Sequence, residues 1–154
     1  MLKKVLAGIW RRLPSRFRLF TLRFTNPTFT VTAAAIIFNE NGKVLVLKHP
    51  FRPGSGWGLP GGFLKQGEQP VDALYRELRE EIGLEIEEVE IFWARSFKRP
   101  RQIEIIFRAV SRGNPQPRSM EVESAIWFSV DELPSGLPKD QRSLVKLAVE
   151  KRPV

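Results

Sequence analysis

The sequence contains no cysteine, one histidine and one tyrosine among its 154 residues. The absence of cysteine excludes disulfide bonds, thiolate metal sites and cysteine nucleophiles, and it is typical of a protein from a reducing compartment. Because His49 is the only imidazole, catalysis by several histidines is excluded as well. His49 stands between an apolar segment and a loop, so we expect a surface or substrate-loop residue and not a metal ligand.

Long apolar runs are also missing. No stretch approaches the roughly 20 apolar residues that a membrane-spanning helix requires. The apolar run at residues 5–10 is too short for the core of a secretory signal, and Arg11 and Arg12 follow it directly. We therefore expect a cytoplasmic protein, with peripheral attachment to a membrane as the alternative.

Positive charge is abundant, because 25 Lys and Arg against 17 Asp and Glu give a formal net charge of +8. Such a balance favours polyanionic partners such as nucleotides, nucleic acid or acidic lipid. The first 24 residues contain no acid and seven basic residues, which are Lys3, Lys4, Arg11, Arg12, Arg16, Arg18 and Arg23. Apolar residues recur among them at helical spacing, so residues 1–27 are predicted to form a basic amphipathic helical arm.

The role of this arm remains open at the level of sequence. It could pack against the rest of the chain or against the partner subunit of a homodimer. It could instead contact RNA or an anionic membrane surface, or it could be a disordered leader. Charge alone does not choose among these roles, because lipid and nucleic acid phosphates attract the same side chains.

Residues 28–154 alternate strand-like and helical segments and are numerous enough to bury the core of one domain. Strands are predicted at residues 28–38, 43–48, 85–95, 103–110 and 124–129, and a turn at residues 39–42 joins the first two as a hairpin. Pro70 fits the start of a helix and Gly83 fits its end. Asp140 is expected to cap a last helix. The predicted order is βββαβββα, which includes one more short strand between residue 48 and the helix that begins at Pro70.

Glu77, Glu80 and Glu81 form the most informative cluster of the sequence. At about 100° per residue they share one flank of the predicted helix, apart from an apolar stripe of Val71, Leu74, Tyr75, Leu78 and Ile82. The carboxylates are therefore expected to flank the buried face without entering it. Three like charges this close require compensation, by Arg76 and Arg79 or by Mg²⁺ or Mn²⁺, since hard cations prefer oxygen ligands. A solvated acidic helix face is the alternative.

The residues around this cluster resemble the signature of the Nudix hydrolase superfamily. A complete Nudix box is formed at residues 62–84 by Gly62, Glu68, Arg76-Glu77-Leu78, Glu80-Glu81 and Gly83-Leu84. The chain also resembles the family in two segments outside the box, which are Gly56-Trp57-Gly58-Leu59-Pro60-Gly61-Gly62 and Trp127 with Asp131-Glu132-Leu133-Pro134. The resemblance covers about residues 30–148. It implies a Nudix hydrolase domain at residues 28–154, folded as an α/β/α sandwich with a mixed sheet.

Members of this family cut a nucleoside diphosphate linked to another group, so the resemblance implies a pyrophosphohydrolase that depends on Mg²⁺, or on Mn²⁺ in its place. By resemblance, Glu77, Glu80 and Glu81 are the catalytic residues and hold the metal, with the carbonyl group of Gly62 as a further ligand. One of the glutamates, Glu77 or Glu81, would accept the proton from the attacking water.

The resemblance also assigns roles outside the glutamate cluster. Glu121 stands six residues before Trp127, the usual offset in the family for a fourth carboxylate ligand, which favours it over Glu123. Both could equally be solvated surface charges. Glu68 and Arg76 are expected to form an ion pair that supports the site without taking part in the chemistry.

Substrate identity is less well specified. Pro100 lies sixteen residues beyond Leu84, an offset associated with hydrolases of ADP-ribose and related nucleoside diphosphate sugars. The tyrosine that marks diadenosine polyphosphate hydrolases and the extended motif of NADH pyrophosphatases are both absent. The lack of cysteine argues against the isopentenyl diphosphate isomerases that share this fold. The candidate substrate contacts are Arg52, Trp57, Arg99 and Arg101.

Three functions from different classes therefore remain. The first is a hydrolase of ADP-ribose or another small nucleoside diphosphate derivative. The second is an enzyme that removes a pyrophosphate or cap from the 5′ end of RNA or acts on nucleoside triphosphates, with the basic arm holding RNA. The third is a regulatory module that binds a nucleotide without cutting it, which the intact glutamate set argues against.

Overall fold

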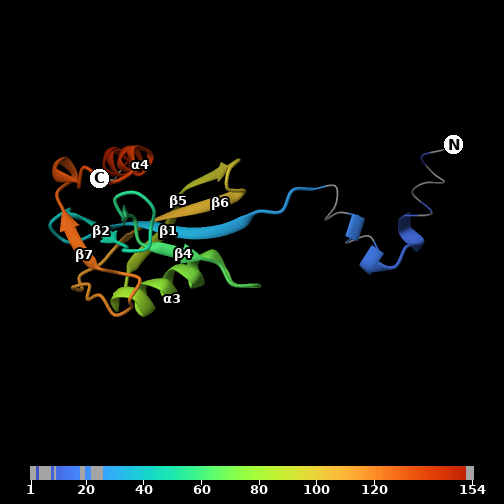
Figure 1. Ribbon diagram of the computed structural model, residues 1–154, viewed down its shortest axis with the longest axis horizontal. Helices are drawn as coiled ribbons and strands as arrows, with labels where there is room; N and C mark the ends of the chain where they lie inside the picture. The colour runs from blue at the N-terminus through green and yellow to red at the C-terminus, as the bar shows by residue number, and fades with distance from the viewer. Residues whose placement is uncertain (1–2, 4–7, 9, 18–19, 22–25, 152–154) are drawn as a thin grey trace.

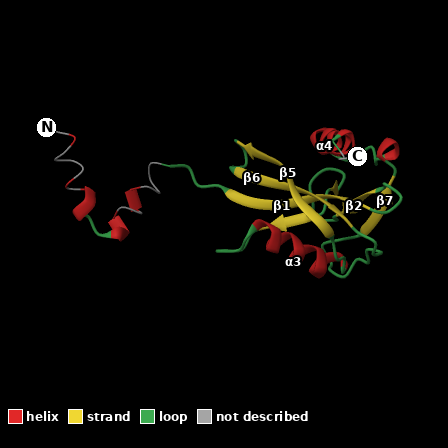
Figure 2. Ribbon diagram, turned by 180° about the vertical axis from the view of Figure 1, so that it is seen from behind, coloured by secondary structure: helices red, strands yellow, loops and turns green. Residues whose placement is uncertain are grey.

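The computed structural model describes residues 3, 8, 10–17, 20–21 and 26–151 (Figure 1). Residues 10–12, 15–17 and 20–21 are helical, while the continuous helical arm over residues 1–27 stays a prediction, because residues 1–2, 4–7, 9, 18–19 and 22–25 lie outside the described residues. In both views these helical turns lie apart from the sheet (Figures 1 and 2). Within the described part of the chain, no helix has the length and apolar character needed to cross a membrane.

A single mixed sheet forms the body of the domain. Its centre is the parallel pair β1 (Thr30–Phe38) and β6 (Gln102–Val110), and all other pairings are antiparallel. β5 (Glu87–Phe97) extends the sheet beyond β6, while β2 (Val44–Lys48), β3 (Trp57–Gly58), β4 (Gly61–Phe63) and β7 (Ser124–Phe128) lie on the other side.

Two helices cover opposite faces of this sheet (Figures 1 and 2). Successive residues of β1 point to opposite faces, as the pleat requires. Ala35 and Ile37 belong to the core cluster of α3 (Pro70–Ile82), whereas Ile36 and Phe38 belong to the core cluster of α4 (Lys139–Glu150). The α/β/α sandwich with a mixed sheet is therefore confirmed.

The predicted turns agree with the structure. In the hairpin between β1 and β2, the Asn39 side chain accepts hydrogen bonds from the backbone N–H groups of Asn41 and Lys43. Pro70 begins α3, and Gly83 ends it in the left-handed conformation with φ 61°. These residues act through local backbone preferences, so the sequence alone locates them.

Two predictions about the elements are wrong. Asp140 does not cap α4, because Pro138 occupies the cap position and Asp140 lies within the first turn, where it forms an ion pair with Arg95 at 2.7 Å. Four strands precede α3 where three were expected. Pro60 lies between β3 and β4 and has no N–H for a sheet hydrogen bond, so the segment forms two short strands.

Candidate functional site

The close approach of β4 to α3 brings the backbone of Gly62 against the side chain of Glu77. β4 is held there by its pairing with β1, in which Gly62 lies opposite Ala33. A Cβ atom at Gly62 would lie 2.4 Å from the carboxyl carbon of Glu77, so only glycine leaves room for this carboxylate. The backbone at residue 62 and the carboxylate are thus close neighbours, as required if both are to contact one cation.

Arg76 organises the polar groups beside this contact. Its guanidinium donates two hydrogen bonds to Glu68, at 2.8 and 2.9 Å, and a third to Glu77 at 2.7 Å. Glu80 lies 3.6 Å from the same guanidinium. The hydrogen bonds from Arg76 lower the pKa of Glu68 to about 2. The expected Glu68–Arg76 pair is present, and it joins the loop before α3 to the helix.

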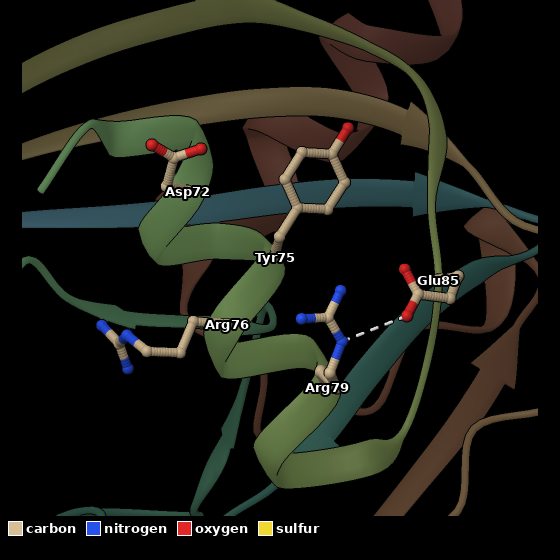
Figure 3. Close-up of a pocket in the computed structure, with 5 residues that line it drawn as sticks. All are labelled: Asp72, Tyr75, Arg76, Arg79 and Glu85. Atoms are coloured by element: carbon tan, nitrogen blue, oxygen red, sulfur yellow. Dashed lines mark hydrogen bonds and ion pairs between the residues drawn. The ribbon is translucent and has the colours of Figure 1, made fainter.

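Arg79 does not compensate the glutamate cluster, contrary to our expectation. It pairs instead with Glu85, at 3.2 Å. Figure 3 shows Arg79 turned toward Glu85 and Arg76 turned to the other side of the helix. These residues line a surface hollow of about 430 Å³ together with Asp72 and Tyr75. Because its cations are already paired with carboxylates, this hollow is a poor candidate for a phosphate site.

Glu81 lies in the interior, although its sequence position predicted that it would only flank the buried face. Glu81 is only 6% exposed, and the Oε2 atom of its carboxylate has no hydrogen-bond partner. Burial, together with the negative charges of Glu77 and Glu121, raises the pKa of Glu81 to about 7. A buried carboxylate without a partner is costly in its charged form, so this position favours a cation.

The loop before β7 closes over the end of α3. The backbone N–H of Arg118 donates to the carbonyl oxygen of Glu81 at 2.7 Å. The Nδ1–H of His49 donates to the carbonyl oxygen of Glu121 at 2.9 Å. His49 is only 8% exposed, so the surface position that we expected as one of two alternatives is wrong, and a role in a substrate loop stays a prediction. Burial lowers the pKa of His49 below its usual value, which keeps this imidazole neutral at pH 7.

Glu121 and Glu123 differ in their surroundings. The charge of Glu121 acts on Glu81, whereas Glu123 forms an ion pair with Lys48 at 2.9 Å. This difference favours Glu121 as the fourth acidic residue of the cluster. Its role as a metal ligand stays a prediction.

The acidic side chains are not gathered into a finished metal site. Among the described residues, no group of three or more His, Asp or Glu side chains is placed to hold a metal ion. The guanidinium of Arg76 holds Glu77 and approaches Glu80, which occupies two of the three carboxylates. The unpartnered Oε2 of Glu81, the mutual repulsion of the carboxylates and the space left by Gly62 nevertheless fit a hard divalent cation.

A second hollow of about 310 Å³ begins next to this cluster. Arg52 lies in its wall, in the space that the missing side chain of Gly58 leaves open. Burial lowers the pKa of Arg52, while the charges of Glu81 and Glu104 act in the opposite direction. Arg52 thus lines the hollow while its charge acts on Glu81, and a guanidinium is a strong partner for a phosphate group.

The walls of this hollow combine aromatic rings with charged groups. Arg95 pairs with Glu104 at 2.6 Å and with Asp140 at 2.7 Å, and its guanidinium lies 4.8 Å from the centre of the Phe97 ring. The remaining lining residues are Trp57, Pro100, Gln102, Pro138 and Gln141. The hollow thus offers aromatic rings for stacking and fixed polar groups for hydrogen bonding, the two kinds of contact that a nucleoside requires.

The sequence predictions for this hollow were incomplete. Arg52, Trp57 and Pro100 line it, whereas Arg99 and Arg101 are exposed and are not among its lining residues, so their contact with substrate stays a prediction. The hollow is also lined by residues that were not predicted to contact substrate, among them Arg95, Phe97, Glu104, Asp140 and Gln141. Arg95 and Phe97 are two residues apart on β5, and this period-two spacing was the available signal that both share one face.

Comparisons with known proteins agree with this geometry. A family model for the NUDIX domain matches residues 28–148. The chain is 32% identical over 117 residues to a protein of Pseudomonas aeruginosa named NAD-capped RNA hydrolase NudC, a match that covers 75% of this chain and 41% of that protein. The chain thus spans about two fifths of the length of this relative.

Two further relatives match over more of their own length. A MutT-like protein of Streptomyces ambofaciens is 29% identical over 108 residues, which covers 70% of this chain and 68% of that protein. The crystal structure of a MutT NUDIX hydrolase from Burkholderia pseudomallei has 26% identity and a TM-score of 0.69, and the match covers 78% of this chain and 98% of that one.

Proposed function

Because the chain belongs to the Nudix family, we propose that it is a metal-dependent pyrophosphohydrolase that cleaves the diphosphate bond of a nucleoside diphosphate linked to another group. The observation that carries this proposal is that Arg52 lines the hollow beside Phe97 while its charge acts on the buried carboxylate of Glu81. A diphosphate bound to Arg52 would face the carboxylates while its nucleoside entered the hollow. The names of the relatives support the same class of reaction.

The proposed metal ligands are the carboxylates of Glu77, Glu80, Glu81 and Glu121 and the carbonyl oxygen of Gly62. A bound Mg²⁺, or Mn²⁺ in its place, would supply Lewis acidity toward the phosphoryl oxygens. Loading the site requires Glu77 to exchange its contact with Arg76 for the cation.

The chain's own residues account for the remaining steps. Arg52 binds oxygens of the diphosphate and orients it toward the cluster. The oxygen of a water molecule attacks one phosphorus atom, the bond from that phosphorus to the bridging oxygen breaks, and a carboxylate of the cluster accepts the proton of the water. Glu77 and Glu81 are the candidates for this base, and the buried position of Glu81 makes it a strong proton acceptor once it is ionised.

The substrate that fits best is ADP-ribose or a nucleoside diphosphate sugar. The hollow has about the volume that one nucleoside needs, and Trp57 and Phe97 offer rings against which a base could stack. Pro100, whose offset suggested this substrate class, lies in the wall of the hollow. With the nucleoside in the hollow and the diphosphate on Arg52, the second sugar of the substrate would extend away from the hollow.

The match to an NAD-capped RNA hydrolase favours a second candidate, a dinucleotide at the 5′ end of RNA. Such a substrate has the same diphosphate bond beside a nucleoside, so the same residues would act on it. The chain spans only 41% of that relative, which places this candidate second.

A substrate panel tests the proposal. The purified chain is incubated with ADP-ribose, a nucleoside diphosphate sugar, NAD, NAD-capped RNA, triphosphorylated RNA and nucleoside triphosphates, each with Mg²⁺, with Mn²⁺ or with EDTA. We expect release of a nucleoside monophosphate from ADP-ribose with Mg²⁺ and none with EDTA. Glu81→Gln should remove this activity, whereas Glu123→Gln, which changes an acidic residue of the neighbouring loop, should retain it.

The other outcomes separate the remaining functions. Faster turnover of NAD-capped RNA than of ADP-ribose would select the second candidate. Turnover of nucleoside triphosphates alone would contradict both. Tight binding of ADP-ribose without turnover of any substrate would establish a nucleotide-binding module and overturn the proposal of an enzyme.

A further inference from the structure

Nearly all of the net charge of this protein belongs to its first 27 residues. That segment carries seven Lys and Arg and no Asp or Glu. The remaining residues carry 18 Lys and Arg and 17 Asp and Glu, so their net charge is only +1. The attraction to polyanions that the overall charge of +8 suggests is therefore a property of the arm and not of the NUDIX domain.

The described part of the arm exposes large apolar side chains next to these charges. Trp10 is 41% exposed, Phe17 is 61% exposed and Phe20 is 58% exposed. Phe17 and Phe20 each lie in a helical segment, and together with Arg16 they line one apolar hollow of about 330 Å³, so both rings face the same space. Arg11, Arg12 and Arg16 are exposed as well.

We propose that this arm is a docking surface for an anionic lipid membrane, on which it lies at the interface without crossing it. The arginines would contact the phosphates of acidic lipids, and Trp10, Phe17 and Phe20 would insert among the headgroups and upper acyl chains. Helices of this kind bind through apolar burial and charge attraction together, which is the combination that the described residues present.

Charge complementarity distinguishes a membrane from the other occupants. A second copy of the arm would bring seven more positive charges against the first seven, and the nearly neutral domain has no excess of acid to compensate them. RNA would satisfy the arginines through its phosphates, but it would cover the rings of Phe17 and Phe20 only where unpaired bases stack on them. An anionic membrane surface satisfies both groups at once.

Sedimentation of the full chain with lipid vesicles tests this proposal without any measurement of catalysis. One set of vesicles contains phosphatidylcholine alone, and the other contains about 30 mol % phosphatidylglycerol as the anionic lipid. We expect binding to the anionic vesicles to be at least about tenfold tighter, and to weaken as salt rises. Tryptophan emission should shift to shorter wavelength on binding, because Trp10 enters an apolar phase.

Two variants and one matched control separate the contributions. The double substitution Phe17→Ser with Phe20→Ser keeps all charges and should weaken binding at least about tenfold through the lost apolar contact. Replacing Arg11, Arg12 and Arg16 with Gln should have an effect of the same order. The control replaces the exposed Lys43, Arg112 and Lys146 of the domain with Gln, which removes the same number of charges and should leave binding nearly unchanged.

Several results would overturn the proposal. Equal binding to both vesicle types would show that the charges are not used. Binding that is insensitive to the phenylalanine substitutions, and that an RNA oligonucleotide competes away, would identify a phosphate contact with nucleic acid. If the protein bound neither type of vesicle, a membrane would be excluded as the partner of the arm.

Discussion

Replacing Glu81 with Gln should make the metal-free protein more stable at pH 8, although the same change should abolish its proposed activity. The carboxyl group of Glu81 has a pKa of about 7 in the folded protein against 4.5 for an ordinary glutamate, with burial as the main cause. Between these values the folded state binds a proton that the unfolded state has released. The wild-type protein therefore loses stability as the pH rises from about 4.5 through 7.

The size of this effect follows from the shift. At about 1.4 kcal/mol for each pKa unit, the shift from 4.5 to about 7 sets an upper bound of about 3.5 kcal/mol on the penalty above pH 7. Glutamine has nearly the same shape and never ionises, so the Glu81→Gln protein escapes this penalty. Its advantage over the wild type should be near zero at pH 4.5 and should reach about 2 to 3 kcal/mol at pH 8, which corresponds to several degrees in Tm for a domain of this size.

Urea denaturation in EDTA at several pH values between 4.5 and 8 measures this difference. The matched control is Glu80→Gln, because the Glu80 side chain is 59% exposed and its neutralisation should change stability by no more than about 0.5 kcal/mol. Added Mg²⁺ should stabilise the wild type more than the Glu81→Gln protein. A stability difference that is the same at pH 5 and pH 8 would refute the reasoning, since it would show that ionisation of this carboxylate is not what costs stability.

Three further predictions concern the residues around this carboxylate. Gly62→Ala should weaken Mg²⁺ binding about tenfold or more in calorimetry, because the added Cβ displaces the neighbouring carboxylate, and an unchanged affinity would exclude a shared site. Arg52→Met should lower kcat/KM on the best substrate about 10- to 100-fold while Mg²⁺ affinity persists, and Arg99→Met, as the exposed control, should change it far less. Glu121→Gln should lower the pKa of the buried glutamate, as followed by NMR in metal-free protein, because a negative charge that raises this pKa is removed. Glu123→Gln should not, and equal shifts would contradict the placement of the two residues.

Much of the local structure could be predicted from the sequence. Pro70 and Gly83 mark the ends of α3, and the spacing of Glu77 and Glu81 places both on one flank of that helix. Such features depend on backbone preferences and on neighbours three or four residues away, which are properties of the chain itself. The resemblance to the family signature additionally predicted the α/β/α sandwich and the ion pair between Glu68 and Arg76.

Other features depend on which segments meet in space. Glu81 is buried at the end of α3, where the backbone N–H of Arg118, in the loop before β7, donates to its carbonyl oxygen. The spacing of residues along α3 does not show which loop packs against the helix, so the sequence predicted that the Glu81 carboxylate would lie at the edge of the core. Arg76 and Arg79 are both basic neighbours of the cluster in sequence, but only Arg76 turns toward it.

The nucleoside hollow shows the same division between sequence and tertiary structure. Its residues come from the loop at Arg52, from β5 and β6, and from the first turn of α4. The sequence by itself determined the helix, its three glutamates and the charge of the arm, because these follow from residue type and spacing. Only the tertiary structure decided that Arg95 would bridge Glu104 and Asp140, that Glu81 would be buried, and that Arg52 would line the hollow while its charge acts on Glu81. Those contacts join residues far apart in the chain, and their energies depend on burial that exists only once the sheet and both helices have packed.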